Sequence, residues 1–377
     1  QLGGLHMQRG RESGEYADYV RAEEYARRSL ALRTNRNGRS FLSLSASLLA
    51  QHRFVEARDV ARRVVAREPE VPQYRALLGE ADLELGDYDA ARAAFDSIPG
   101  RDRAHLSIAP RLARRAELAG RTDDARRILT AARDRAAARA DLPREQVAWF
   151  DLRLGDLELR AGRPNAARRA YELGLAAAPG DYRLLGAMAR LAAALGDADA
   201  AIDYGERAIR LMLDPATLGV VSDAYAARGD RGRAEEYARA MEVAVAGQPG
   251  PYHRAWALFL LDHDHRVPEV LARAEEEIRT RHDIYGDDLL AWALHKSGRD
   301  GEARHASAAA LRLGTADATL HYHAGAIALS SGDTAAARAA LARALAINPR
   351  FDPRLAAAAR RTLRDLERAA APEPWSW

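Results

Sequence analysis

Residues 77–98 read LLGEADLELGDYDAARAAFDSI, and this stretch contains the pattern that organises most of the chain. Gly86-Asp87 is a turn signal. Apolar residues at helical spacing precede the turn, at Leu78 and Leu85, and follow it, at Ala91 and Phe95. Because such spacing places apolar side chains on one face of a helix, the stretch predicts two amphipathic helices joined by a tight turn.

The same turn recurs along the sequence at nearly constant spacing. Gly-Asp or Gly-Arg pairs begin at Gly86, Gly120, Gly162, Gly196, Gly229, Gly298 and Gly332, with gaps of 34, 42, 34, 33, 69 and 34 residues. The gap of 42 contains an eight-residue insertion around residues 140–143, and the gap of 69 spans two periods, with His263-Asp264-His265 at the missing turn. A fixed period of this length indicates a repeat protein.

Small residues follow the same period. They lie seven positions before the turn, at Gly155, Ala189, Ser222, Ala291 and Gly325, and five positions after its glycine, at Ala91, Ala125, Ala167, Ala201, Ala234, Ala303 and Ala337. Small side chains at both places allow two antiparallel helices to approach closely. Pro69, Pro179 and Pro349 fall where a second helix should end, because proline cannot continue a helix. The pattern predicts an all-α solenoid of helical hairpins.

These motifs resemble the tetratricopeptide repeat (TPR) family. The family's order of Leu-Gly, Gly-Asp-Tyr, Ala and Phe or Tyr is matched at residues 78–95, and similar copies occupy residues 154–179 and 324–349. The resemblance implies a right-handed superhelix with repeats at 38–71, 72–105, 106–139, 148–181, 182–215, 215–248, 250–283, 284–317 and 318–351. The 250–283 repeat departs most from the family pattern, since it lacks the turn glycine and carries Pro268 near its second helix.

The two ends differ from the array. We expect residues 1–37 to form a partial N-terminal repeat, and residues 352–370 to form a capping helix with Arg and Glu facing outward. Residues 371–377 contain two prolines and cannot be helical. Because Trp375 and Trp377 would be costly to leave in water, this tail favours docking on the chain's own groove or on a neighbouring molecule.

Composition and charge exclude several classes of function. The 377 residues carry a formal net charge of +3, and the only lysine is Lys296, which is typical of GC-rich coding and favours a bacterial source. Acidic residues are interspersed throughout, so we expect no nucleic-acid partner. With no Cys, disulfides and thiol catalysis are excluded. No apolar run approaches the ~18–20 residues of a membrane span. The start at Gln1 rather than Met slightly favours an exported, trimmed protein, and the compartment stays open.

Signals for catalysis are weak. No phosphate loop, dinucleotide fingerprint or nucleophile elbow is present, so we expect no enzyme activity and no cofactor. His263-Asp264-His265 and His321-Tyr322-His323 contain the residue types of a metal site. Alternate positions on a helix point to different faces, however, and His321 falls at an inward-packing position of the repeat. Zinc or copper would need a third ligand, such as His295 or Asp287, and we expect no metal.

The resemblance also implies that the first helix of each repeat lines a concave groove. Carried over one position at a time, the groove residues are Trp149, Asp156, Arg160, Arg183, Arg190, Asp223, Arg254, Tyr285, Asp288, Trp292, His295, Lys296 and Tyr322. Aromatic and arginine side chains are typical anchors of protein interfaces. The carboxylate clamp of chaperone-adaptor repeats needs Asn and Lys in the groove, and here every Asn lies in a turn or a repeat end, so we expect no chaperone-tail receptor.

Two functions remain open from the sequence. The first, which we favour, is a non-enzymatic scaffold that binds a peptide or protein partner in the groove. The second is a self-assembling subunit of a head-to-tail filament, whose tail at Trp375 and Trp377 docks on a neighbour. A solenoid end can receive another repeat, and a contact of this kind that does not close on itself produces a filament. The identity of the partner does not follow from the fold.

Overall fold

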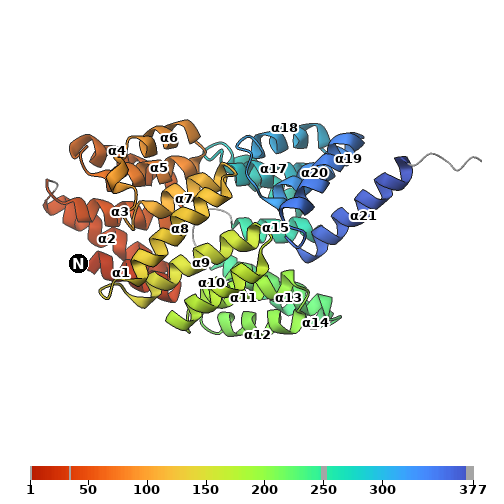
Figure 1. Ribbon diagram of the computed structural model, residues 1–377, viewed down its shortest axis with the longest axis horizontal. Helices are drawn as coiled ribbons and strands as arrows, with labels where there is room; N and C mark the ends of the chain where they lie inside the picture. The colour runs from red at the N-terminus through yellow and green to blue at the C-terminus, as the bar shows by residue number, and fades with distance from the viewer. Residues whose placement is uncertain (1, 34, 248–252, 371–377) are drawn as a thin grey trace, which may run out of the picture.

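The computed structural model describes residues 2–33, 35–247 and 253–370. Within these residues all regular secondary structure is helical, with twenty-one α-helices, one short 3-10 helix and no strand. Consecutive helices pair as antiparallel hairpins that stack side by side (Figure 1). The predicted all-α solenoid is therefore confirmed.

Ten hairpins and one further helix make up the described part of the chain. The hairpins are α1 (Leu2–Ser13) with α2 (Tyr16–Leu32), α3 (Gly38–Ala50) with α4 (Phe54–Arg67), α5 (Pro72–Leu85) with α6 (Tyr88–Asp96), α7 (Ala109–Leu118) with α8 (Thr122–Ala137), α9 (Arg144–Arg160) with α10 (Pro164–Ala177), α11 (Tyr182–Ala194) with α12 (Ala198–Ile209), α13 (Pro215–Ala227) with α14 (Arg231–Ala246), α15 (Arg254–Asp262) with α16 (Val267–Glu277), α17 (Ile284–Lys296) with α18 (Asp300–Ala310), and α19 (Ala318–Ser330) with α20 (Thr334–Ile347), followed by α21 (Pro353–Ala370).

The hairpin geometry follows from the repeated residues. Gly86 ends α5 in the left-handed region, at φ +86°, which a residue with a side chain rarely adopts. The chain then reverses and α6 begins two residues later. Gly79, seven positions before this turn, lies against the ring of Phe95, and a Cβ at residue 79 would meet that ring at 2.8 Å. The small residue therefore allows the two helices of the hairpin to touch.

The superhelix closes on itself along a line of contacts that we call the seam. On one side are the turns of the early hairpins, and on the other are the loops that join the late hairpins. The amide of His282 donates to the carbonyl of Leu85 at 2.9 Å. The Thr315 hydroxyl donates to the Leu118 carbonyl, and the Asn348 side-chain amide donates to the Leu159 carbonyl at 2.8 Å.

The seam contacts keep a regular register. Arg281 meets Glu84 across 197 residues of sequence, and Thr315 meets Leu118 across the same separation. Asn348 meets Leu159 across 189 residues, because the early side of the seam has passed the eight-residue insertion by then. An advance of one hairpin on the early side thus matches an advance of one hairpin on the late side. The separation of 189–197 residues corresponds to between five and six hairpins in one superhelical turn.

The ends of the array also have defined structure. The N-terminal segment, which we expected as a partial repeat, contains both helices of a hairpin, α1 and α2. At the other end α21 packs on α20, as a cap would. The tail with Trp375 and Trp377 lies outside the described residues, so its docking and the head-to-tail filament stay predictions. Among the residues described, no helix has the length and apolar character needed to cross a bilayer.

Candidate functional site

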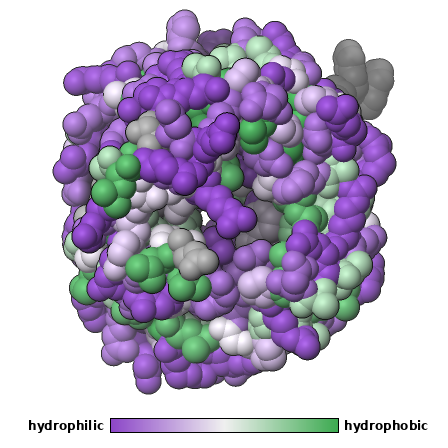
Figure 2. All heavy atoms as spheres, turned by 90° about the vertical axis from the view of Figure 1, so that its left-hand side faces the viewer, coloured by the Kyte–Doolittle hydropathy of each residue, from purple (hydrophilic) through white to green (hydrophobic). Residues whose placement is uncertain are grey.

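The candidate site is an open cavity on the inner side of the superhelix, and we call it the chamber. It has a volume of about 620 Å³ and is lined by Arg111 and Arg114 of α7, Trp149, Arg153 and Arg160 of α9, and Tyr285 of α17, among others. Helices α7 and α9 belong to the early hairpins, whereas α17 belongs to the late ones. Closure of the seam therefore builds the chamber. Figure 2 shows that one face of the molecule is hollowed at its centre, with both hydrophilic and hydrophobic residues around the hollow.

A shared carboxylate dominates the electrostatics of the chamber. Glu117, whose side chain is 9% exposed, accepts ion pairs from Arg160 at 2.5 Å, Arg114 at 3.1 Å and Arg153 at 3.5 Å. Burial alone would raise the pKa of Glu117, but the three guanidiniums outweigh it and lower the pKa to about 2. The carboxylate is therefore ionised at neutral pH, and three guanidiniums share it.

A second carboxylate, Asp156, lies on α9 between Arg153 and Arg160. Asp156 accepts a hydrogen bond from the Tyr171 hydroxyl at 2.9 Å and ion pairs from Arg190 at 3.3 Å and Arg153 at 3.8 Å. It lines a second cavity of about 460 Å³, together with Arg160, Arg190 and residues of the late loops such as Asn348 and Phe351. Because Arg160 lines both cavities, it joins the two parts of the interior.

The opposite wall of the chamber comes from the late hairpins. The Tyr285 hydroxyl lies 3.5 Å from the Asp317 carboxylate, and the Arg114 guanidinium lies over the Tyr285 ring at 5.4 Å from its centroid. Burial raises the pKa of Tyr285 to about 12, and it raises the pKa of Asp317 above its ordinary value. This wall thus places a phenol hydroxyl and a carboxylate in the chamber together with the arginines of α7 and α9.

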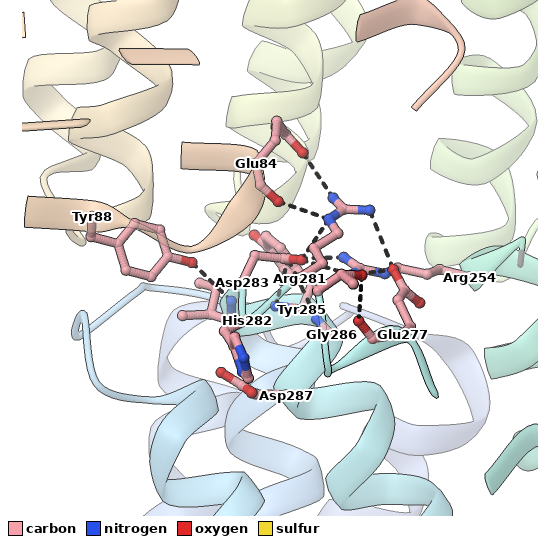
Figure 3. A network of polar contacts seen from close by, with 12 residues as sticks. Glu84, Tyr88, Arg254, Glu277, Arg281, His282, Asp283, Tyr285, Gly286 and Asp287 are labelled. Atoms are coloured by element: carbon pink, nitrogen blue, oxygen red, sulfur yellow. Dashed lines mark hydrogen bonds and ion pairs between the residues drawn. The ribbon is translucent and has the colours of Figure 1, made fainter. Parts of the chain in front are cut away.

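An ion-pair network holds this wall against the early hairpins (Figure 3). Arg254 makes two bonds to Asp283, at 2.6 and 2.8 Å, and one to Glu277 at 2.7 Å. Arg281 crosses the seam to the backbone carbonyl and the carboxylate of Glu84, each at 2.8 Å. Burial alone would raise the pKa of Asp283, but the two arginines outweigh it and lower the pKa. These groups pair with one another, so we assign them to the seam and not to a ligand.

The structure gathers eight of the predicted groove residues around the interior. Trp149, Arg160 and Tyr285 line the chamber, Asp156, Arg190 and Asp223 line the second cavity, and Arg254 and Asp288 line a third of about 320 Å³. The others are engaged elsewhere. Arg183 pairs with Asp181 and Glu145, His295 with Asp300, and Lys296 with Asp264, while Tyr322 packs against Phe351.

Two expectations about this region are wrong. Trp292 is only 3% exposed, because the His323 ring covers its face at 4.2 Å and its indole N–H donates to Asp262 at 2.9 Å. The tryptophan has the repeat position of a groove residue but is covered by the next hairpin. Of the two histidines that flank Tyr322, His323 and not His321 is the fully buried one, and its Nδ1 donates to the Asp288 carboxylate at 3.0 Å.

The sequence reasoning missed Arg114, Arg153, Glu117 and Asp317. It counted groove positions from the start of each repeat, but α7 begins at Ala109, later than the 106–139 range implied. Counting backward from the turn glycine would have found Arg114. It lies six positions before Gly120, as Asp156, Arg190 and Asp223 lie six positions before their own turn glycines. Within the described residues, no group of three or more His, Asp or Glu side chains is placed to hold a metal ion.

Comparisons with known proteins agree with this repeat architecture. Models of the tetratricopeptide repeat match residues 48–114, 152–212 and 318–351. No curated protein sequence matches the chain.

Several solved structures resemble the chain. The hetero-tetramer of the APC/C proteins Cut9 and Hcn1 is 14% identical over 97% of this chain and 86% of that one, with a TM-score of 0.39. A tetratricopeptide repeat protein of Parabacteroides merdae is 16% identical over 70% and 98%, with a TM-score of 0.40. Yeast Tom70 is 11% identical over 98% and 97%, with a TM-score of 0.36. The matches, in three separate parts of the array, show that this chain contains tetratricopeptide repeats.

Proposed function

We propose that this protein is a non-enzymatic interaction scaffold that binds an acidic segment of a partner protein in the chamber. The observation that carries the proposal is the sharing of Glu117 among Arg114, Arg153 and Arg160. Arginine binds carboxylates strongly and often through two parallel hydrogen bonds. A carboxylate from a partner would add an acceptor for the guanidiniums that share Glu117, of which Arg153 also lies 3.8 Å from Asp156.

The aromatic residues of the chamber support a peptide ligand in preference to a small anion. Trp149 is half-buried in the chamber wall, and Tyr285 faces it from the late hairpins. Rigid aromatic side chains beside arginines are the residues that contribute most to protein interfaces. A segment with an acidic residue and a neighbouring apolar residue would contact both kinds of side chain.

The proposal is tested by titrating the protein into a fluorescein-labelled peptide that carries Glu and Leu in a Gly-Ser spacer, with fluorescence anisotropy as the readout. The Gln counterpart of the peptide is the ligand control. We expect the Glu peptide to bind at least about tenfold more tightly than the Gln peptide, because charge-assisted bonds to arginine are lost with Gln.

Arg111 provides a matched control variant. It lines the same chamber and lies on the same helix as Arg114, but it already forms an ion pair with Glu80 at 2.7 Å. We expect Arg160→Gln to weaken the Glu peptide by about tenfold and Arg111→Gln to leave it within about twofold. Equal affinity for the two peptides, or equal loss in both variants, would contradict the proposal.

A further inference from the structure

A second surface arises where one hairpin is incomplete. Helix α6 has nine residues, whereas the second helices of the other described hairpins have between 11 and 17. Pro99 and Gly100 stop it, and residues 97–108 lead to α7 with only the short 3-10 helix η1 (Gly100–Asp102) on the way. The last turns that a second helix would normally lay against the next hairpin are therefore missing.

The missing turns leave a groove of about 380 Å³ between residues 100–104, α7 and α8, which we call the α7–α8 groove. Its floor is apolar and consists of Leu112 and Ala116 from α7 and Ile128 and Ala132 from α8. The floor residues Leu112, Ala116 and Ala132 are buried, and Ile128 is half-buried. The floor thus consists of alanine and aliphatic side chains, which are suited to packing against a helix.

The groove and the chamber use different residues of α7. Arg111 and Arg114 line the chamber, whereas Leu112, Arg115 and Ala116 line the groove. At 3.6 residues per turn Leu112 and Ala116 lie about 100–140° around α7 from Arg111, and Arg115 lies about 100° from Arg114. The two surfaces share no residue, so a ligand can occupy one without touching the other.

The rim of the groove is strongly basic. Five arginines line it, namely Arg103, Arg115, Arg121, Arg127 and Arg135, while the one acidic residue that lines it is Asp124. Arg127 pairs with Asp124 at 2.8 Å, and Arg121 lies 3.6 Å from the same carboxylate.

The remaining rim arginines are only partly neutralised. Arg115 pairs with Asp96 at 2.7 Å. Arg103 and Arg135 donate to backbone carbonyls, of Ile98 at 3.1 Å and of Ala104 at 2.6 Å, which carry no full charge. Five guanidiniums therefore face two carboxylates, and the excess positive charge surrounds an apolar floor.

We propose that the α7–α8 groove docks a short acidic amphipathic helix of a partner protein. The apolar face of such a helix replaces the missing turns of α6 on the floor, and its acidic face meets the arginine rim. Charge complementarity and the vacant helix position both point to this occupant. A nucleic acid would use the arginines but would leave the apolar floor without a contact.

The test uses a synthetic amphipathic peptide of Glu, Ala and Leu, labelled with fluorescein, and the full chain as it is. Arg127 is a suitable site for substitution, because it lines the groove and its side chain is 71% exposed. Arg169 occupies the same position on α10, seven residues after the turn glycine, and is likewise exposed, but it lies outside the groove. Arg127→Glu and Arg169→Glu therefore change the charge of the protein equally.

We expect Arg127→Glu to weaken peptide binding by about tenfold and Arg169→Glu to leave it unchanged, with circular dichroism showing both variants folded. A second variant, Ala131→Glu, places a like charge inside the groove on an exposed residue of α8 and should weaken the peptide as well. Arg160→Gln, which affects the chamber, should have no effect on this peptide, so failure here is distinguishable from failure of the proposed function.

Three results would overturn the proposal. Equal losses in Arg127→Glu and Arg169→Glu would show attraction to the overall charge and not to the groove. No loss in Arg127→Glu or in Ala131→Glu would place the peptide elsewhere. A single-stranded oligonucleotide that binds more tightly than the peptide and responds to the same variants would assign the groove to nucleic acid.

Discussion

Gly86 lies against the backbone that joins His282 to Asp283, so that a Cβ on residue 86 would meet the Asp283 amide nitrogen at 2.7 Å and overlap the His282 carbonyl. The two residues belong to different passes of the superhelix. This close approach allows the His282 amide to bond to the Leu85 carbonyl at 2.9 Å. Gly86 thus has two roles: it allows the turn within its hairpin, and it allows the backbone contact that closes the coil.

Substitution of turn glycines should separate these two roles. Gly86 and Gly196 have nearly the same φ, +86° and +81°, but a Cβ on Gly196 would meet nothing within 4 Å. Gly196→Ala should cost only the strain of the left-handed conformation, roughly 1–2 kcal/mol. Gly86→Ala should cost more, because it also disrupts the seam.

Denaturant titration of the two variants measures the difference. The free energy of unfolding should fall further in Gly86→Ala than in Gly196→Ala. Equal losses would mean that the seam contributes nothing beyond the turn.

Loss of the shared carboxylate in the chamber should destabilise the protein strongly. Glu117→Gln leaves Arg114, Arg153 and Arg160 without their common anion, and removal of one partner from a buried charge cluster costs about 3–5 kcal/mol. The control Glu80→Gln removes a more exposed carboxylate that pairs with Arg111 alone, and it should cost about 1 kcal/mol or less.

The pH dependence of this difference has a definite sign. The folded-state pKa of Glu117, about 2, lies below its ordinary value of 4.5. The stability that Glu117 contributes is therefore present above pH 4.5 and is lost as the pH falls toward about 2. The free energies of unfolding of wild type and Glu117→Gln should converge over that range. A difference between them that stays constant with pH would contradict the ion-pair account.

The two neighbouring histidines should respond to pH in opposite ways. Burial alone would lower the pKa of His323, but Asp288, with smaller contributions from Asp262 and Asp317, outweighs it and raises the pKa. Its contribution is fully present below the unfolded value near 6.5 and is lost as the pH rises through the folded pKa. For His321 burial lowers the pKa, so protonation of this residue opposes folding.

Glutamine variants of each histidine test this contrast. On acidification from pH 8 to pH 5, a range that spans the ordinary histidine pKa, wild type should gain stability relative to His323→Gln. Over the same range it should lose stability relative to His321→Gln. If both variants follow the wild-type curve in parallel, neither histidine titrates with folding as the contacts imply.

The sequence was sufficient for the repeat architecture because local signals specify it. A turn glycine such as Gly86 and a small partner such as Gly79 act within a single hairpin, where spacing along the chain equals spacing on a helix. The TPR family and the all-α solenoid could both be predicted from such signals.

The seam and the chamber could not be predicted in the same way. Contact between Leu118 and Thr315 depends on small rotations accumulated over more than five hairpins, and no residue pattern records their sum. The late start of α7 shifted the register and concealed Arg114, while the cover of Trp292 by His323 depends on side-chain packing between repeats. The interior site is therefore a property of the closed coil.

Closure of the coil, on which the chamber depends, is tested most directly by small-angle X-ray scattering of the full chain, compared with a Gly86→Ala, Gly120→Ala double variant. Like Gly86, Gly120 lies against late-loop backbone, at Gly314. We expect the wild-type curve to fit the closed coil and the double variant to show a larger radius of gyration. A wild-type curve that fits only an open solenoid, or identical curves for the two proteins, would contradict the closed chamber.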